Sequence, residues 1–423
     1  MSTCSTDKSF PATEVEASSR AEGGAPPVAF VRWPIKVFMM DLWCYVPYYD
    51  GYLCKSLGGA DVDLTLGAIS YHRDRGHFAR LGLQNDPGLL DVVSRLPLRN
   101  ALARRALKFL EFLVNSLALA IRFAWTAPDI LHVQFVPILE KGLPLEIWFL
   151  QYVRRLGIKI VYTVHNVLPQ STGQLRKEIY QRAYRLADAL ICHNEAAQTR
   201  LIEEFGLDPK RIWLIPHGPM FHDQQPPSVE EARARLGFPP GQCVILWQGI
   251  VKPYKGLDFL LEAWRAVQAQ GRDACLVIAG SGEEKQLRAV EDKVRSLGVE
   301  SSVRLELRFL SVRELTLYYQ AADVIAYPYK EITTSGALMT GLSYKKALVA
   351  TNLPPFREVL RDGDNAALVE YGDVGGLAAV LRRLIQQPSE RKRLAEGIPA
   401  VTADENPWAP IAHETLRCYH SLL

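Results

Sequence analysis

The sequence predicts an α/β fold in which two doubly wound domains each hold a parallel sheet covered by helices. Three observations lead to this prediction. The chain of 423 residues, 48% of them hydrophobic, is too long for one ordinary core and fits two domains of roughly 150–200 residues. Short buried strands alternate with helical patterns along the chain, as they do in parallel sheets. The two halves also follow the same order of elements.

The composition argues against several classes of protein. The formal net charge is only +3, whereas nucleic-acid-binding proteins usually have a concentrated basic face. No run of about 18 uncharged apolar residues occurs, so we expect no transmembrane span. The seven cysteines are scattered, odd in number and without a C-x-x-C pair. This favours a reduced, cytoplasmic protein with no nucleic-acid partner and no zinc site.

The N-terminal domain is expected at 31–222. Residues 1–30 are rich in Ser, Ala, Glu, Gly and Pro and lack the apolar core of a signal peptide, so we expect a disordered tail there. Residues 48–53 are expected to form a loop that leads into the first helix, and a later helix is predicted around 145–156. Apolar runs predict strands at 35–40, 62–66, 130–135, 158–164, 189–192 and 212–215.

Residues 98–125 have the pattern of one long helix. Polar residues recur at helical spacing among Leu, Phe, Ala and Ile. The helix either packs on the sheet or rests, with its basic and apolar side chains, on an anionic membrane surface. The second alternative places a cytoplasmic protein on the inner face of the membrane, as a peripheral enzyme that acts on a lipid.

The second half begins after a polar, Pro-rich linker at 223–241. A second α/β domain is expected at 242–405, and a final helix at 406–423 has no strand after it. Strands and helices are predicted in alternation at 243–247, 257–268, 274–279, 283–297, 303–307, 312–322 and 324–327, with a last strand at 347–350.

The loop after the strand at 324–327 is the best candidate for a phosphate site. It is polar and ends at Ser335 and Gly336, where a helix is expected to open. A strand, a loop and a helix start leave unpaired backbone N–H groups and the positive end of a helix dipole at one point. This arrangement suits a phosphate group.

Two other loops of the second half have a related composition. In the loop at 247–258, Gly249 permits close backbone approach, while Lys252 and Lys255 beside a helix start would offset the charge of a diphosphate. The loop at 279–282 is a weaker match. Tight turns account for the glycines of both loops equally well, so neither loop alone identifies a function.

Together, the three loops and the two domains resemble the retaining nucleotide-sugar glycosyltransferases of family four, also called glycosyl transferases group 1. The resemblance covers about 35–423 by order of elements, and its specific residues cluster in 245–360. It implies the GT-B fold, with two Rossmann-like domains facing a central cleft. The acceptor domain would be 31–222, the nucleotide-sugar donor domain 242–405 and the crossover helix 406–423.

The resemblance implies roles for residues of the donor domain. Lys255 would hold the donor diphosphate, and Ser335 and Gly336 would present backbone N–H groups to it. Arg308 lies in the stretch where the family usually contacts the nucleotide base. The donor-binding residues implied in this way are Gly249, Lys252, Lys255, Arg308, Glu331, Ser335 and Gly336.

The resemblance also implies roles in the first domain. His165 follows an apolar strand and resembles the family's histidine that meets the transferred sugar, so we expect His165 and Lys255 to be catalytic. Asp50 and Gly51 stand where the family has paired glycines, which predicts an acceptor side particular to this protein. The expected acceptor-binding residues are Asp50, Gly51, His132 and Asn166. Further cleft candidates are Gln134, His193, Glu195 and His217, with Trp43, Tyr48 and Tyr49 for stacking on a sugar.

The sequence departs from the family pattern at two places. The family commonly has two glutamates with seven residues between them. Here Glu331 is present, but its partner position falls on Met339 or, counted back from the following strand, on Thr340. The carboxylate that usually binds the ribose of the nucleotide in this family is therefore missing. Ile250 replaces an arginine of the first loop, so Lys252 is expected to supply that charge.

These residues lead to the hypothesis of a metal-independent, retaining glycosyltransferase of the hexosyltransferase type. It would move a sugar from a nucleotide-diphosphate sugar, the co-substrate, to a hydroxyl of a saccharide acceptor in polysaccharide or glycoconjugate assembly, and no cofactor is expected. The helix at 98–125 motivates a lipid-linked acceptor, such as a polyprenyl-diphosphate-linked saccharide. Two alternatives stay open: a nucleotide-sugar epimerase, and a non-catalytic saccharide-binding protein of the same fold.

Overall fold

The structure is a computed structural model in which residues 34–423 form one compact unit. It describes residues 34–59, 61–96, 100–168, 174–268, 273–399 and 406–423. The tail expected at 1–30 lies outside the described residues. Among the described helices, none combines the length and the apolar composition needed to cross a bilayer.

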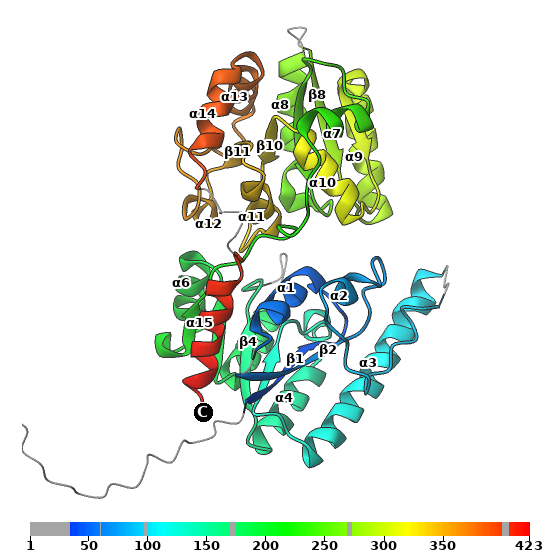
Figure 1. Cartoon of the computed structure of the whole chain (residues 1–423), viewed down its shortest axis with the longest axis vertical. Coiled ribbons are helices and arrows are strands. Elements are labelled where there is room, and N and C mark those ends of the chain that lie inside the picture. The colour runs from blue at the N-terminus through cyan, green and yellow to red at the C-terminus, as the bar shows by residue number, and fades with distance from the viewer. Residues whose placement is uncertain (1–33, 60, 97–99, 169–173, 269–272, 400–405) are drawn as a thin grey trace, which may run out of the picture. The chain divides into compact units, whose positions relative to one another are not determined.

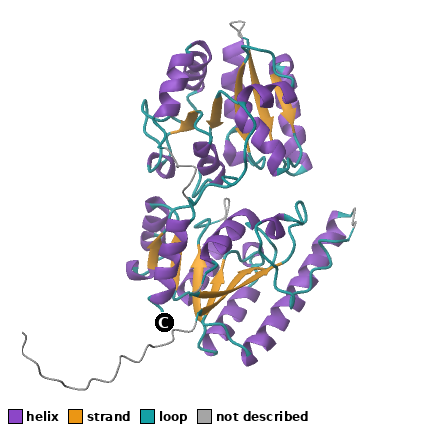
Figure 2. Ribbon diagram, viewed as in Figure 1, coloured by secondary structure: helices purple, strands orange, loops and turns teal. Residues whose placement is uncertain are grey.

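The first half contains a six-stranded, fully parallel sheet, sheet A, in the order β2-β1-β3-β4-β5-β6. Figure 2 draws the strands of both sheets in orange. Its strands are β1 Ile35–Asp41, β2 Val62–Ala68, β3 Ile130–Val133, β4 Lys159–Thr163, β5 Ala189–Cys192 and β6 Ile212–Leu214. All six predicted strands of this half are present. Its helices are α1 Pro47–Leu57, α2 His77–Arg80, α3 Ala101–Trp125, α4 Leu145–Arg155, α5 Gln174–Leu186 and α6 Glu195–Glu203, with 3-10 turns η1 Leu139–Lys141 and η2 Pro209–Arg211.

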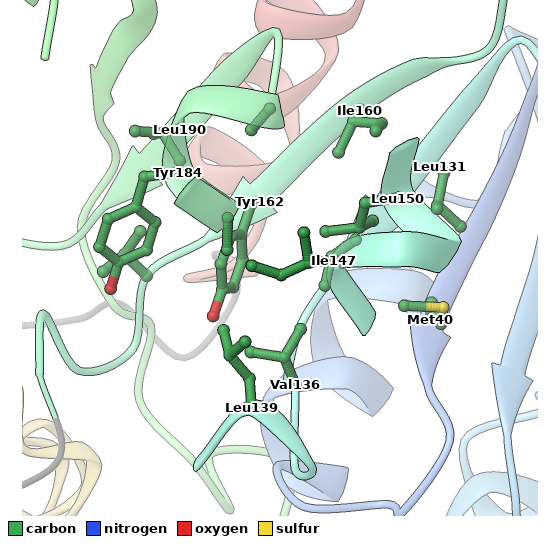
Figure 3. Close-up of a cluster of buried hydrophobic side chains, with 14 of the residues drawn as sticks. Met40, Leu131, Val136, Leu139, Ile147, Leu150, Ile160, Tyr162, Tyr184 and Leu190 are labelled. Atoms are coloured by element: carbon green, nitrogen blue, oxygen red, sulfur yellow. The ribbon is translucent and has the colours of Figure 1, made fainter. Parts of the chain in front are cut away.

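Successive side chains of the strands of sheet A point to opposite faces of the sheet, and both faces are covered by helices. Phe38 and Met40 belong to one apolar cluster, which contains buried side chains of α3, α4 and α5. Figure 3 shows part of this cluster, in which Met40 and Leu131 of the sheet lie near Leu150 of α4. Val37 belongs to the cluster on the other face, which contains α1 and the C-terminal helix.

The second half contains sheet B, also six-stranded and parallel, in the order β12-β11-β10-β7-β8-β9. Its strands are β7 Cys243–Gln248, β8 Ala274–Ala279, β9 Val303–Glu306, β10 Val324–Tyr327, β11 Ala347–Thr351 and β12 Ala367–Val369. Its helices are α7 Val229–Leu236, α8 Leu257–Gln268, α9 Glu284–Leu297, α10 Val312–Ala321, α11 Gly336–Ser343, α12 Pro354–Arg357, α13 Val374–Gln386 and α14 Pro388–Glu396, with η3 Pro253–Lys255 and η4 Glu300–Ser302.

The sheet-B half also has helices on both faces of its sheet. Buried side chains of α8, α9 and α13 belong to one apolar cluster, and α8 and α13 lie side by side (Figure 1). Buried side chains of α7, α10 and α11 belong to the other cluster. The helix α7, which falls inside the region expected to be the linker, packs on α10.

The last helix, α15 Ala409–His420, packs against α1 in the first half. Trp408, which precedes it, is completely buried, and its indole Nε1 donates a hydrogen bond of 2.8 Å to the carbonyl oxygen of Pro219. A Cβ atom on Gly218 would lie 2.5 Å from the Trp408 ring. Trp408 therefore holds the segment that follows β6 in place.

The prediction of a loop at 48–53 is wrong, because α1 already begins at Pro47. The carboxylate of Asp41 accepts the backbone N–H groups of Tyr45 and Val46, at 2.5 and 2.9 Å, and so closes the turn after β1. Proline is favoured in the first turn of a helix because its missing N–H group is not needed there. The turn is thus complete before residue 48.

Candidate functional site

A cavity of about 310 Å³, the main cavity, lies where strands of both sheets end. Its lining residues follow β1, β2, β4 and β6 of sheet A and β7, β8 and β9 of sheet B, or belong to α11. The carboxyl ends of parallel strands are where open α/β sheets bind ligands. The described lining residues include three Lys or Arg side chains and no Asp or Glu, so the main cavity suits an anionic ligand.

Lys255, the last residue of η3, lines the main cavity without an ion pair to a described carboxylate. Its Nζ atom lies 5.2 Å from the centroid of the Tyr329 ring. Burial lowers the pKa of Lys255. A Cβ atom on Gly249 would lie 2.4 Å from Nζ, so a side chain there would displace the ammonium group. A half-buried cation with no described carboxylate partner is stabilised by an anionic ligand.

The loops around Lys255 approach one another closely at glycine residues. Gly256 has a φ of 68°, and a Cβ atom there would lie 1.7 Å from the carbonyl oxygen of Pro328. A Cβ atom on Gly280 would lie 1.8 Å from the carbonyl oxygen of Gly249. Only glycine allows such close backbone approach, so these residues fix the positions of the loops after β7, β8 and β10.

The helix α11 points its first turn at the main cavity. Ser335 is the N-cap residue, and its side chain accepts the backbone N–H group of Leu338 at 3.1 Å. Gly336 and Ala337 line the main cavity. The first N–H groups of a helix have no acceptor within it, and they lie at the positive end of its dipole. Gly336 thus faces the cavity as predicted, whereas the hydroxyl of Ser335 caps the helix.

His165, just after β4, lines the main cavity from the first half. Its Nε2 atom lies 3.0 Å from Oε1 of Gln134, and its Nδ1 atom lies 3.3 Å from Nε2 of His193. Burial and the neighbouring histidines hold the pKa of His165 well below its usual range, so the ring is neutral at pH 7. His217 also lines the cavity, and burial lowers its pKa to about 4.

The structure therefore brings together five of the predicted catalytic and donor-binding residues, which are Gly249, Lys255, Arg308, Gly336 and His165. The further cleft candidates Tyr48, Tyr49 and His217 also line the main cavity. The guanidinium group of Arg308 lies 2.8 Å from a carboxylate oxygen of Glu314 and 3.6 Å from one of Glu306, so its charge is already compensated.

Two predicted donor-binding residues point elsewhere. Nζ of Lys252 lies 3.5 Å from Oε1 of Glu283, and Lys252 does not line the main cavity. Its expected role in place of the missing arginine is therefore not supported. Glu331 lines a second cavity of about 190 Å³, together with Arg200. The polar loop after β10 directs this carboxylate away from the main cavity.

Three of the four predicted acceptor-binding residues are buried away from the main cavity. Asp50 and Gly51 lie inside α1, and a Cβ atom on Gly51 would lie 2.8 Å from Nε2 of His77. Burial and the neighbouring Asp41 raise the pKa of Asp50, which favours the protonated form of its carboxyl group. The placement of these two residues in a loop at the site is wrong. His132 is also fully buried, between the hydroxyl groups of Tyr419 and Thr163 at 2.6 and 2.7 Å.

Asn166, the fourth of these residues, is exposed and does not line the main cavity. Its carbonyl oxygen lies 3.4 Å from the hydroxyl group of Tyr184, which also donates a hydrogen bond of 2.7 Å to the carbonyl oxygen of Val167. Asn166 therefore belongs to the turn after β4 and is not brought together with His165 at the cavity.

Arg73 and Thr340 are among the lining residues that fall outside the predicted site. Arg73 follows β2, and its Nη1 atom donates a hydrogen bond of 2.5 Å to Oγ of Ser281. Its position after a strand was a usable signal, although nothing in the sequence places it near Ser281. Thr340, one candidate position for the missing carboxylate, lines the cavity and donates a 2.8 Å hydrogen bond from Oγ1 to the carbonyl oxygen of Gly336. A backbone-bound hydroxyl therefore stands at that position.

Two family models match the chain. Residues 242–387 match a model described as "Glycosyl transferases group 1", and residues 53–218 match one described as "Glycosyltransferase Family 4". The curated D-inositol 3-phosphate glycosyltransferase of Thermomonospora curvata is 26% identical over 267 residues, which are 58% of this chain and 62% of that protein. The chain thus matches about three fifths of the length of such relatives.

Solved structures share the arrangement of the two sheets. The Anabaena protein HepE in complex with UDP and glucose superposes with a TM-score of 0.71 at 15% identity, over 92% of this chain and 100% of HepE. Sucrose-phosphate synthase from Thermosynechococcus elongatus superposes with a TM-score of 0.66 at 16% identity, over 92% and 99% of the two chains. At these identities the likeness shows the fold alone.

Proposed function

Because the chain belongs to the group 1 and family 4 glycosyltransferases and has their GT-B fold, as the sequence predicted, we propose that it transfers a sugar from a nucleotide-diphosphate sugar to an acceptor hydroxyl. One observation carries the proposal: the unpaired ammonium group of Lys255 and the first turn of α11 at Gly336 face the same cavity. Both stabilise a diphosphate. HepE, which has this fold, was solved with UDP and glucose.

The proposed reaction retains the configuration of the transferred sugar. The bond between the anomeric carbon and the β-phosphate oxygen breaks while the acceptor oxygen bonds to the same face of that carbon. The acceptor proton passes to the departing phosphate oxygen, so atoms and charge balance without a protein acid. Lys255 and the N–H groups of Gly336 and Ala337 stabilise the charge that grows on the phosphate. This chemistry requires neither a metal ion nor a cofactor.

His165 is proposed to contact the transferred sugar as a neutral hydrogen-bonding group. Burial lowers the pKa of His165, which disfavours the imidazolium form that a general acid needs. The contact between His165 and Gln134 fixes the ring at the wall of the main cavity. In this proposal, the first half binds the acceptor and the second half binds the donor.

The acceptor is proposed to be a lipid-linked saccharide, such as one on polyprenyl diphosphate, with the protein peripheral on the cytoplasmic face of a membrane. The support is α3, whose two sides are both apolar. Phe112, Leu119 and Phe123 are buried in the core, whereas Leu117 and Trp125 on the other side are 63% and 85% exposed. Exposed apolar side chains that follow one face of a helix mark an interaction surface.

The exposed face of α3 also has basic residues at its N-terminal end, where Arg104 and Arg105 are exposed. Trp148 of α4, which packs against α3, adds a further exposed aromatic side chain. Apolar and basic side chains on one surface favour binding to anionic lipids. The name of the Thermomonospora relative suggests D-inositol 3-phosphate as an additional acceptor to test.

A panel of UDP-, GDP-, ADP- and dTDP-sugars tests the proposal and separates it from the two alternatives. Slow hydrolysis of one donor, accelerated by a saccharide acceptor, supports the transferase. An isomerised donor indicates an epimerase, which would need acidic groups over the sugar, and the described lining residues of the main cavity include none. If no donor reacts with any acceptor, the result supports a saccharide-binding protein. Activity in EDTA tests the metal-independent mechanism.

A further inference from the structure

Arg73 reaches from the first half of the chain to the second at the edge of the main cavity. It follows β2 of sheet A, yet its Nη1 atom donates a hydrogen bond of 2.5 Å to Oγ of Ser281, which follows β8 of sheet B. Its Cζ atom lies 5.4 Å from the centroid of the Phe309 ring, after β9. All three residues line the main cavity.

The positive charge of Arg73 is not compensated by a described carboxylate. Asp74, the next residue, forms its ion pair with Arg80 instead. The contacts of the Arg73 guanidinium group are a neutral hydroxyl and an aromatic ring. The other arginine of the cavity, Arg308, differs because Glu314 and Glu306 pair with it. Lys255 and Arg73 are therefore the two lining cations that an incoming ligand can neutralise.

Arg73 and Lys255 border the same pair of loops. Ser281, which holds Arg73, accepts the backbone N–H group of Val251 at 2.8 Å, so the loops after β7 and β8 are joined there. Gly280 lies against the carbonyl group of Gly249, and Nζ of Lys255 lies over Gly249. The guanidinium and ammonium groups thus approach one cavity from neighbouring positions.

We propose that Arg73 binds the diphosphate of the donor in the main cavity, together with Lys255. This inference rests on the proposed function. A nucleotide-diphosphate sugar has one negative charge on each of its two phosphates, which matches the two uncompensated cations. Arginine suits this role because its planar fork of N–H groups binds phosphate oxygens in pairs. Donor binding then replaces the neutral contact to Ser281 and draws a residue of the acceptor half onto the donor.

Calorimetric titration with UDP, with inorganic pyrophosphate as a competitor, tests the assignment in the full-length protein. We expect Arg73→Gln to weaken the binding of both probes about tenfold or more, and Arg73→Lys to weaken it less. Arg75→Gln is the matched control. Arg75 lies two residues away, donates a hydrogen bond of 2.6 Å to the carbonyl oxygen of Ser94 and does not line the main cavity.

The outcomes separate this inference from the proposed function. If the wild type binds UDP and Arg73→Gln binds it equally well, Arg73 has no part in donor binding. If Arg73→Gln loses affinity for UDP but pyrophosphate competes as before, Arg73 contacts the base over Phe309, and the diphosphate assignment is wrong. If the wild type binds none of UDP, GDP, ADP and dTDP, the proposed function fails and this inference fails with it. Because Arg73 is exposed, circular dichroism is expected to show an unchanged fold.

Discussion

The rings of His165 and His193 are in contact at an interplanar angle of 45°, with Nδ1 of His165 3.3 Å from Nε2 of His193. Nδ1 of His193 lies 3.0 Å from the carbonyl oxygen of Ile215, which can only accept, so this nitrogen has the proton. Burial lowers the pKa of both rings, to about 3 in His193, and keeps them neutral. Nδ1–H of His165 therefore donates to His193, and Nε2 of His165 presents a lone pair to Gln134. In the structure the NH2 group of Gln134 lies 2.9 Å from Sδ of Met39 and 3.2 Å from Nε2 of His132. The neutral histidine pair is satisfied when this amide is assigned the other way round, with its NH2 group towards the lone pair of His165.

Gln134 is accordingly predicted to position His165. Gln134→Leu keeps the volume of the side chain but removes the donor, so we expect kcat to fall about tenfold, the effect of one hydrogen bond of about 1.4 kcal/mol, while KM changes little. Gln181→Leu is the control, because Gln181 lies on α5 and its amide donates a hydrogen bond to the carbonyl oxygen of Phe205. Equal loss of kcat in the two variants would indicate general destabilisation. Steady-state kinetics with the identified donor measure both constants.

Lys255 is predicted to contribute to donor binding at a cost in stability. Lys255→Met removes a half-buried charge that has no described carboxylate partner, so we expect an unchanged or higher Tm without ligand and the loss of the Tm increase that UDP gives the wild type. Lys252→Met is the control, because Lys252 pairs with Glu283 outside the main cavity. Thermal unfolding with and without UDP measures both effects. A variant that UDP still stabilises fully would remove Lys255 from the site.

Glu146 gives the fold a predictable dependence on pH. Burial raises the pKa of Glu146 to about 8, so the folded protein holds a proton that the unfolded chain releases above pH 4.5. The stability that this group contributes is therefore lost as the pH rises towards 8, by up to about 1.4 kcal/mol per pH unit. Glu146→Gln keeps the acceptor for the N–H group of Ile138, at 2.7 Å from Oε1, and removes the titration.

Urea unfolding of the wild type and Glu146→Gln between pH 5 and 8 checks this prediction. We expect the difference in the free energy of unfolding to grow in favour of the variant as the pH rises. Glu203→Gln, at an exposed position of α6, is the control and is expected to follow the wild type. A difference that stays constant across this range would show that Glu146 is ionised in the folded protein.

The exposed face of α3 is predicted to bind membranes. We expect the wild type to co-sediment with phosphatidylglycerol vesicles more than with phosphatidylcholine vesicles. The double variant Leu117→Ser, Ile121→Ser replaces two exposed apolar side chains and should lower the bound fraction severalfold. Val359→Ser serves as the control, because it replaces an exposed apolar side chain that is distant from α3 in the sequence. A wild type that never sediments with either vesicle would contradict the peripheral location.

The strands were predictable because their signal is local. Most of the first eleven strands have a run of buried apolar residues, and such runs are visible without knowledge of the fold. The last strand, β12, has only three residues, and the helix after it begins with Val374 and two glycines, which have low helix propensity. These elements form through packing on their neighbours in the sheet, and so the sequence alone does not indicate them.

The candidate site was predictable where a backbone conformation defines it. Gly249 and Gly336 occupy positions that a side chain would obstruct, and their place at strand ends and helix starts already indicated this. The directions of long side chains were not predictable. Lys252 turns to Glu283, and Arg73 crosses to Ser281, because tertiary partners far apart in the sequence decide where such flexible chains point.

Trp408 links the order of synthesis to the completion of the main cavity. Its indole ring supports Gly218 and bonds Pro219, beside His217 and Met220 of the cavity wall. A nascent chain whose ribosome has not yet released residues 406–423 lacks this support, although both sheets have already been translated. The wall of the main cavity around Gly218 is therefore completed after both sheets, and a chain cut before Trp408 is expected to lose the UDP binding proposed for this cavity.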